Sequence, residues 1–593
     1  MFYLTPHFTL HIPHSLNLTS LQYRDILSIS VFSNRYKPIF AVYIYLIFVI
    51  YNEQTLYYKE RGLLDLMKTR ILKPDCEADI AFAGEALRNG ELICIPTETV
   101  YGLAADALNP EAVSNIFVVK GRPNDNPLIV HIADFDDIYP LVKYVPEEAK
   151  KLAEKFWPGP LTMVLPKSDL VPMRTSGGLQ TVAIRFPSHP TAQAIIKATG
   201  KPLAAPSANL SGKPSPTEFK YCLEDLDGKI AGIVDGGDCA VGVESTVLTL
   251  AEGTPRVLRP GGITVEMLRT VLDEVIVDDA VIHGLAKDAK ASSPGMKYKH
   301  YSPKADITIA DMSLEDYVSL MKNNPECGAL CFDGEEKYFN NKSVSFGKEY
   351  DGESQAQRLF AALNELDEKG MNKVYSRRVQ KHEVGLAVFN RLVRSAGFNI
   401  IHSDFNIIGL TGMTGSGKSY VADFFRKQGI PVIDCDAVTK IPNLYNADDF
   451  VPAFGEEVKN SDGSLNRRKL AEIAFSTEGG KQKLEEITFP IILNKIEEMI
   501  SQVKLEGNKV VVLDAPTLFD CGLQDKCSRI VVVTADENIR LERIIKRDNI
   551  TEEQAKLRMN AQHDLTHFAD VVINTNTTRD LTEEIKAILE DLK

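Results

Sequence analysis

The chain has 593 residues, of which 44% are hydrophobic and 25% are charged, and its net charge is −14. This length excludes a single hydrophobic core, so several domains are expected. The net negative charge excludes binding of DNA through a broad positively charged surface, because such a surface needs an excess of lysine and arginine.

The first 66 residues differ in character from the rest of the chain. They are rich in tyrosine and contain the apolar run PIFAVYIYLIFVIY at 38–51. This run is shorter than the ~20 residues of a membrane-spanning helix, and no signal-peptide cleavage site follows it. An ordinary soluble pattern begins at Met67. We therefore expect Met67 to be the natural start and residues 1–66 to be an artefact of the gene boundary, with a membrane anchor as the alternative.

Residues 67–290 carry the pattern of a twisted α/β domain. ELICIPT, at 91–97, is typical of a buried strand, and EEAKKLAEKF, at 147–156, has the apolar spacing of a helix. We interpret other short apolar runs with polar ends as further strands: IFVVKGR, NPLIVHI, LTMVLP and TVAIRFP.

Two pairs of polar residues stand two positions apart at the ends of such runs. Lys120 and Arg122 belong to the sequence K-G-R, and Ser207 and Asn209 to S-A-N. In an extended chain, residues i and i+2 project from the same face. We therefore expect the first pair to present two cations to a phosphate, and the second to present two hydrogen-bonding groups to a ligand. A solvated turn is the alternative for K-G-R.

Seven motifs follow one another in this part of the chain: PTETVYGL, KGRPNDNPLIVHI, WPGPLT, TVAIRFPSHP, APSANLSG, ESTV and LRPGG. With these motifs the chain from 67 to about 400 resembles the YrdC-type threonylcarbamoyl-AMP synthases. SPGMKYKHYSPKA, at 293–305, looks like the linker of the family's long form. The resemblance implies conversion of L-threonine, bicarbonate and ATP to threonylcarbamoyl-adenylate and pyrophosphate. This product feeds the t6A modification of tRNA, so t6A-transfer machinery is an implied partner.

The resemblance also implies the residues of the site. Those that would hold threonine are Thr97, Tyr101 at the pocket wall, His131, Arg185 and Ser245. Those that would hold ATP are Lys120, Asn124, Thr181, Ser207, Asn209, Arg259 and the linker's Tyr301. A guanidinium suits the threonine carboxylate because it can bind both oxygens. Joining two anions also needs local positive charge, which makes Lys120 and Arg122 the catalytic candidates.

After the linker at 291–305, residues 306–402 predict a small Rossmann-like domain. ADITIAD and ECGALCFDG are strand patterns, and 354–370 and 384–397 are helical patterns that each end in a glycine. The segment has no catalytic cluster and no Gly-rich dinucleotide fingerprint. We assign it no chemistry and expect it to cover the preceding active site.

The stretch GLTGMTGSGKSYVADFFRK, which begins at Gly409, contains a phosphate-binding P-loop. It fits G-x-x-x-x-G-K-[ST] between a strand and a helix, which is the context that such a loop needs. The residues predicted to bind ATP here are Gly412, Thr414, Gly415, Ser416, Gly417, Lys418 and Ser419. Backbone N–H groups would bind phosphate oxygens, Lys418 would reach the β- and γ-phosphates, and Ser419 would ligate Mg²⁺.

The rest of residues 405–593 predicts a parallel sheet with a helical lid. PVIDCDAV, VVVLDAPTLFD, RIVVVTA and ADVVINTN are strand patterns, and 540–562 is an arginine-rich helical pattern. In this order the segments resemble dephospho-CoA kinase. The resemblance implies transfer of the ATP γ-phosphate to the ribose 3′-hydroxyl of dephospho-CoA.

The candidate residues for this transfer are carboxylates and arginines. Asp436 is the predicted catalytic carboxylate, with Asp434 beside it, and Arg467 would contact the acceptor. Arg543 and Arg547 lie four apart on one helix, so both would face the transferring phosphate. The chain departs from the family in two places. Phe489 and Thr517 replace the usual His of His-Pro and the first Leu of Leu-Leu, and the first change removes a polar group expected near the acceptor.

The leading hypothesis is a bifunctional cytoplasmic enzyme that uses ATP with Mg²⁺ at both sites. Nine scattered cysteines without a paired CxxC motif fit a reducing compartment. The alternative is an RNA-binding YrdC-like module fused to a P-loop kinase with a different or lost acceptor. A third hypothesis, from another class, is a membrane-tethered scaffold with an inactive kinase domain.

Overall fold

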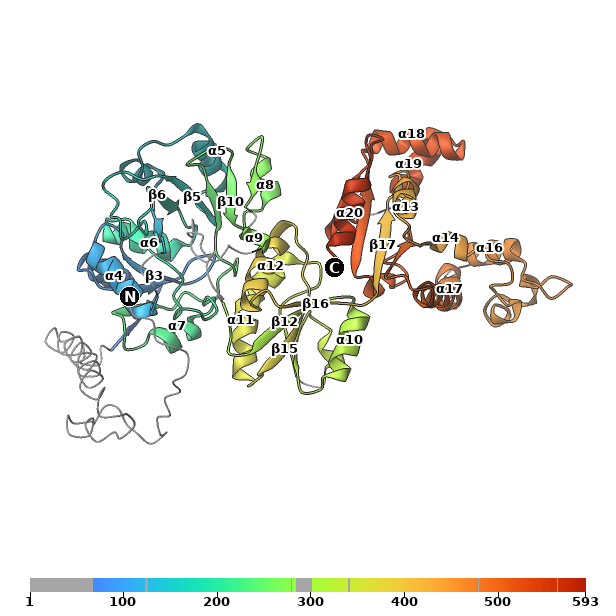
Figure 1. Cartoon of the computed structure of the whole chain (residues 1–593), viewed down its shortest axis with the longest axis horizontal. Coiled ribbons are helices and arrows are strands. Elements are labelled where there is room, and N and C mark those ends of the chain that lie inside the picture. Colours follow the sequence, from blue (N-terminus) through green and yellow to red (C-terminus); the bar gives the residue numbers. More distant parts are fainter. Residues whose placement is uncertain are drawn as a thin grey trace, which may run out of the picture. The chain divides into compact units, whose positions relative to one another are not determined.

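The computed structural model describes residues 68–592, with gaps at 123–125, 279, 284–300, 340–341, 478, 561 and 563. Met67, the run at 38–51, the predicted ATP ligand Asn124 and most of the linker lie outside the described residues. We call residues 69–283 the front region, 301–402 the middle region and 405–592 the back region (Figure 1). All three are α/β, as the sequence predicts. No described helix combines the length and apolar character needed to cross a membrane.

The front region contains one mixed sheet, whose described strands have the order β1-β8-β2-β3-β7-β4-β6-β5-β9-β10-β11. The strands are β1 Arg70–Leu72, β2 Ile93–Ile95, β3 Gly102–Asp106, β4 Ile129–His131, β5 Leu161–Pro166, β6 Thr181–Arg185, β7 Leu203–Ala204, β8 Gly232–Val234, β9 Thr246–Thr249, β10 Arg256–Arg259 and β11 Ile276–Val277. The helices are α3 Glu77–Arg88, α4 Pro110–Lys120, α5 Glu147–Phe156, α6 Pro190–Thr199, α7 Phe219–Leu226, α8 Val265–Arg269 and α9 Ala280–His283.

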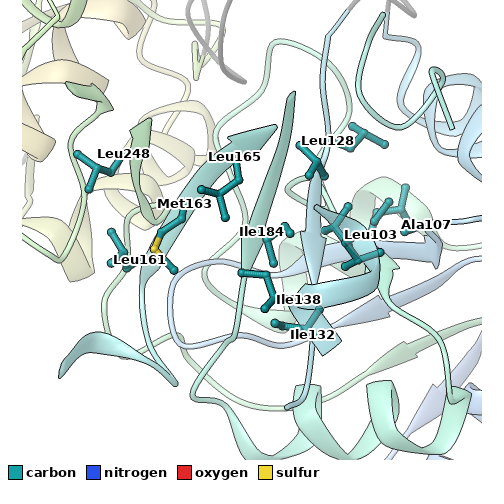
Figure 2. Close-up of a cluster of buried hydrophobic side chains, with 14 of the residues drawn as sticks. Leu103, Ala107, Leu128, Ile132, Ile138, Leu161, Met163, Leu165, Ile184 and Leu248 are labelled. Carbon is teal, nitrogen blue, oxygen red and sulfur yellow. The ribbon is translucent and has the colours of Figure 1, made fainter. Parts of the chain in front are cut away.

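Apolar side chains from this sheet form the main core of the front region. Figure 2 shows Leu103 of β3, Met163 of β5 and Ile184 of β6 gathered in one cluster of buried side chains. Residues two apart in a strand share a face, which is how LTMVLP buries its alternate apolar residues. The same packing fixes the ends of β4 and β6, where His131 and Arg185 are partners in parallel register.

One predicted strand is part of a helix. IFVVK forms the end of α4, which begins after the capping residue Asn109. Gly121 ends the helix in the left-handed conformation, with φ of 61°. Our expectation that Lys120 and Arg122 project from one face of an extended strand is therefore wrong, because Lys120 is the last helical residue. The apolar run was too short to separate a buried strand from a buried helix by its pattern.

The middle region is a parallel sheet with the order β14-β13-β15-β12-β16. Its strands are β12 Asp306–Asp311, β13 Gly328–Cys331, β14 Ser343–Ser345, β15 Lys373–Arg377 and β16 Ile400–His402. Its helices are α10 Leu314–Asn323, α11 Gly352–Glu368 and α12 Glu383–Ser395. The predicted helices at 354–370 and 384–397 are confirmed as α11 and α12, which lie side by side and share one apolar core (Figure 1).

The back region is a second parallel sheet, with the order β18-β19-β17-β20-β21. Its strands are β17 Asn406–Gly412, β18 Val432–Asp434, β19 Val510–Asp514, β20 Arg529–Thr534 and β21 Val571–Asn574. Its helices are α13 Lys418–Lys427, α14 Cys435–Val438, α15 Val451–Phe454, α16 Arg467–Ser476, α17 Gly480–Leu505, α18 Glu537–Asp548, α19 Glu552–Asn560 and α20 Thr582–Glu590. The predicted lid at 540–562 falls into two helices, because Asn549 ends α18 in the left-handed conformation.

Buried ion pairs join the middle and back regions. The guanidinium of Arg529, on β20, donates to both carboxylate oxygens of Asp311, at 2.6 and 2.7 Å. Arg378 binds Asp570 in the same way, at 2.5 and 3.0 Å. Two-pronged pairs of this kind add geometric specificity to charge attraction, so they fix which surfaces meet.

Candidate active sites

A cavity in the front region collects most of the residues predicted to hold threonine and ATP. Polar residues that line it are Thr97, Thr99, Arg122, His131, Arg185, Ser207, Glu244, Ser245, Arg259 and Tyr301. His131, Arg185 and Arg259 are each the last residue of a strand, so the sheet sets their positions. Three arginines around one cavity make a setting that favours an anion.

Arg185 is the best placed of these residues to bind a carboxylate. It is 4% exposed, and its Nη1 donates to Thr99 Oγ1 at 2.9 Å. Its Nη2 lies 2.8 Å from Glu98 Oε1, yet the angles do not make a hydrogen bond. Among the described residues, Nε therefore has no hydrogen-bond acceptor, and the partner of Nη2 is the Glu98 carboxylate of this ion pair. Although burial raises the pKa of Glu98, the charge of Arg185 and smaller contributions from neighbouring polar groups together outweigh burial and lower that pKa.

His131 is a neutral neighbour of this arginine. Its Nδ1 is 3.1 Å from the carbonyl oxygen of Ile129, and its side chain is buried. Burial, aided by the positive charge of Arg185, lowers the pKa of His131 to about 3. The imidazole therefore stays uncharged at neutral pH and can bind only as a neutral group.

Ser245 and Arg259 stand on two adjacent segments of the cavity wall. Arg259 donates from Nε and Nη2 to the carbonyl oxygen of Ser245, at 3.1 and 3.0 Å. The Ser245 hydroxyl lies 2.8 Å from Thr162 Oγ1 and accepts a hydrogen bond from Arg259 Nη2 at 3.2 Å. Ser245 and Arg259 were predicted for threonine and ATP respectively, and the structure brings them into direct contact.

The S-A-N segment binds Lys120 rather than projecting freely. Ser207 Oγ donates to Asn209 Oδ1 at 2.6 Å. The Lys120 ammonium donates to the carbonyl oxygens of Ser207 and Asn209. Lys120 and Asn209 are both buried, so this amine helps to shape the loop beside the cavity.

Two predicted residues are placed differently by the structure. Tyr101 is completely buried in the core and is not among the residues that line the cavity. Its hydroxyl instead donates to the Gly237 carbonyl at 2.7 Å and accepts from Gly236 N–H at 3.0 Å, which secures that loop. Thr181 begins β6 opposite Pro166 and is not among the cavity-lining residues.

The P-loop in the back region has the predicted context, between β17 and α13. Gly415 and Gly417 have φ of 81° and 89°, a conformation that side chains rarely adopt. The Ser416 hydroxyl is buried without a hydrogen-bond partner among the described residues. The Thr414 N–H donates to Gln562 Oε1 at 2.7 Å, so a side-chain oxygen bonds an amide of the loop.

Lys418 pairs with Asp514, the last residue of β19. In the sheet, Asp514 is the register partner of Asp434, the last residue of β18. The carboxyl ends of parallel strands form the usual binding edge of such a sheet. Burial outweighs Lys418 and raises the pKa of Asp514. Sequence reasoning missed Asp514, although its place at the end of a predicted strand was a usable signal.

The lid arginines divide between the P-loop and the surface. Arg543 donates from Nη1 to the Gly415 carbonyl at 3.3 Å, and Arg540, which was not predicted, donates to the Thr414 carbonyl at 3.0 Å. Arg547 is exposed and pairs with Asp548, at 2.8 and 2.9 Å. The structure therefore does not bring Arg547 to the P-loop together with Arg543.

The predicted acceptor residues lie at the end of β18 and in the segments that follow it. Asp434 caps α14 by accepting from the Ala437 N–H at 3.0 Å, and Asp436 is exposed on α14. Arg467 donates to the carbonyl oxygens of Thr439 and Ile441, at 3.2 and 3.3 Å, and so holds the segment that follows α14.

The middle region also reaches the front cavity through a residue that the sequence did not reveal. Arg391, on α12, is completely buried and forms an ion pair with Glu244 Oε2 at 2.9 Å. Glu244 lines the cavity beside Ser245.

The fold and the two sites define a chain with two transferase units, of which the second is a P-loop kinase. Family models match three segments: "Telomere recombination" at residues 85–261, "Threonylcarbamoyl-AMP synthase, C-terminal domain" at 263–397 and "Dephospho-CoA kinase" at 406–580.

Individual relatives agree with these models. A threonylcarbamoyl-AMP synthase of Pyrococcus abyssi is 44% identical over 336 residues, which is 55% of this chain and 96% of that protein. A dephospho-CoA kinase of Geobacillus kaustophilus is 38% identical over 190 residues, which is 31% of this chain and 94% of that protein. The solved structure of P. abyssi Sua5 complexed with L-threonine is 42% identical and has a TM-score of 0.53, covering 56% of this chain and 98% of that one. The chain therefore belongs to the threonylcarbamoyl-AMP synthase family in its front and middle regions and to the dephospho-CoA kinase family in its back region, and it is a fusion of the two.

Proposed function

We propose that this chain is a bifunctional cytoplasmic enzyme. Its first activity joins L-threonine, bicarbonate and ATP to give threonylcarbamoyl-adenylate and pyrophosphate, and the product serves the t6A modification of tRNA. Its second activity transfers the γ-phosphate of ATP to the ribose 3′-hydroxyl of dephospho-CoA. Membership of both families supports the two reaction classes.

The observation that carries the first activity is the position of Arg185 at the cavity, with an Nε that has no hydrogen-bond acceptor among the described residues. A guanidinium can donate to both oxygens of a threonine carboxylate. The neutral His131 and the Ser245 hydroxyl offer partners to the amine and hydroxyl of the amino acid. The amine then attacks bicarbonate, and water leaves to give a carbamate. A carbamate oxygen attacks the α-phosphorus of ATP, and pyrophosphate leaves. Arg122 and Arg259 stabilise the charge that develops, and Lys120 shapes the adjoining loop.

The observation that carries the second activity is the pairing of Lys418 with Asp514 at the P-loop. Lys418 binds the β- and γ-phosphates once ATP competes with the carboxylate. The hydroxyl of Ser419 and the carboxylates of Asp514 and Asp434 are hard oxygen donors that would hold Mg²⁺, which would supply positive charge to the phosphates. Asp436 is exposed next to this edge and can accept the proton of the ribose hydroxyl.

Product analysis of the full chain tests both activities. With threonine and bicarbonate, ATP should give pyrophosphate and an AMP-linked product, and with dephospho-CoA it should give ADP and CoA. Pyrophosphate without ADP would indicate a kinase region that no longer binds its acceptor. Phe489 and Thr517 would then be the first residues to test by substitution. Tight RNA binding without pyrophosphate release would favour the RNA-binding alternative.

The synthase activity should depend on the charge of Lys120. Burial, with a smaller contribution from Arg122, lowers the pKa of Lys120 to about 7. Because the ammonium loses its proton as pH rises through this value, we expect KM for ATP to rise by roughly tenfold between pH 7 and 8.5. Lys120→Arg keeps its charge and should show no such rise. Pyrophosphate release from pH 6 to 9 measures both, and an equal rise in the two proteins would assign it to another group.

A further inference from the structure

Arg391 lies where the middle region meets the wall of the front cavity. It belongs to α12 and is 0% exposed. Its Nε donates to Glu244 Oε2 at 2.9 Å, and its Nη2 donates to the Glu244 carbonyl oxygen at 3.2 Å. Its Nη1 donates to the Pro260 carbonyl oxygen at 2.5 Å. One guanidinium thus binds two chain segments of the front region at once.

These two segments carry the cavity residues Ser245 and Arg259, each directly beside a residue that Arg391 binds. The segments also approach each other closely. A Cβ on Gly261 would lie 2.3 Å from the Thr246 nitrogen and 2.5 Å from the Glu244 carbonyl oxygen. The two segments are too close to move relative to each other. The hydrogen bonds between them therefore determine the positions of Ser245 and Arg259.

Glu244 is the charged partner in this arrangement. Its Oε1 accepts from Ser215 Oγ at 2.6 Å, and it is 6% exposed. The charged and titratable groups that interact with its carboxylate are Arg391, Arg259 and the phenol of Tyr301. Although burial raises the pKa of Glu244, the two arginines outweigh it and lower the pKa to about 2.

We propose that Arg391 is a positioning residue for the synthase reaction. Through it, the middle region fixes the positions of Ser245 and Arg259 in the cavity wall. The proposal rests on the proposed synthase function. Only arginine offers donors in a planar fork that can serve a carboxylate and two carbonyl oxygens together, whereas lysine has one nitrogen at the end of its side chain. The middle region is then a structural part of the active site and not only a cover over it.

The test compares Arg391→Met with wild type in the full chain. We expect kcat/KM for pyrophosphate release to fall about 100-fold, the size of effect that follows from a small misplacement of reacting groups. Dephospho-CoA kinase activity should be unchanged, which reports that the back region is folded. Arg358→Met is the matched control, because Arg358 is a half-exposed arginine of the middle region whose guanidinium binds Glu365. It should keep both activities.

A pH profile separates positioning from a general loss of packing. Without Arg391, the Glu244 carboxylate should protonate more easily, so the ratio of variant to wild-type kcat/KM should fall as pH drops from 8 to 5. Arg391→Met combined with Glu244→Gln should make this ratio independent of pH. A single variant whose activity stays within twofold of wild type, or whose ratio does not change with pH, would overturn the proposal.

Arg391→Lys covers the case in which the methionine variant does not fold. It keeps the charge but cannot make all three contacts, so synthase activity should fall by at least tenfold while kinase activity remains. Loss of both activities in the lysine variant would assign Arg391 to folding alone and overturn the proposal. Absence of threonine-dependent pyrophosphate in wild type would instead refute the proposed synthase function.

Discussion

Lys418→Ala should lower the formation of CoA by at least 10²–10³-fold and leave threonine-dependent pyrophosphate release unchanged. Lys418 is the cation that the P-loop directs to the phosphates, and loss of one preorganised charge at a transition state has effects of about this size. In the structure its ammonium already pairs with Asp514, so the substitution also leaves that buried carboxylate without its partner. Initial rates of ADP and CoA formation at saturating ATP measure the loss.

Lys427→Ala is the matched control for this prediction. Lys427 is the last residue of the same helix α13, is exposed, and lies over the ring of Phe424. It should keep kinase activity within about twofold. If Lys418→Ala also abolished pyrophosphate release in a folded protein, the assignment of two independent sites would be wrong.

Arg185→Ala should have the opposite pattern, with synthase activity reduced and CoA formation intact. Truncation of one member of a buried charge pair typically costs about 2–5 kcal/mol, which corresponds to roughly 30-fold to 4,000-fold in the KM for threonine. The loss has two sources. The substitution removes the guanidinium that binds the threonine carboxylate, and it leaves Glu98 buried without its cation. Pyrophosphate release as a function of threonine concentration gives the KM.

A double variant separates these two sources. Arg185→Ala with Glu98→Ala removes the stranded charge, so thermal stability should recover while the KM for threonine stays high. Arg256→Ala is the matched control, since this strand arginine is half exposed and pairs with Asp278 at the surface. Recovery of the KM for threonine in the double variant would show that Arg185 acts by neutralising Glu98 and not by binding the substrate.

The comparison of α4 with α12 shows how far sequence reasoning reached. α12 was predicted because its apolar residues keep helical spacing up to Gly397. In α4 the apolar run near Lys120 is short and sits beside a polar loop, so its spacing fitted a strand as well. The error moved Lys120 from an extended chain to a helix end, yet the residue still lies beside the site, because its side chain reaches the S-A-N loop.

The sequence by itself determined the P-loop and the order of the strands and helices around it, and the resemblance of its motifs to a known family supplied most of the cavity residues. These features are local, since a phosphate-binding turn and a strand end depend on a few neighbouring residues. Only the tertiary structure decided the partners: Glu98 for Arg185, Asp514 for Lys418, and Glu244 for Arg391, which is 147 residues away in the chain. Buried charges must find a partner somewhere in the folded protein, and which segment supplies it depends on the packing of elements that are distant in sequence.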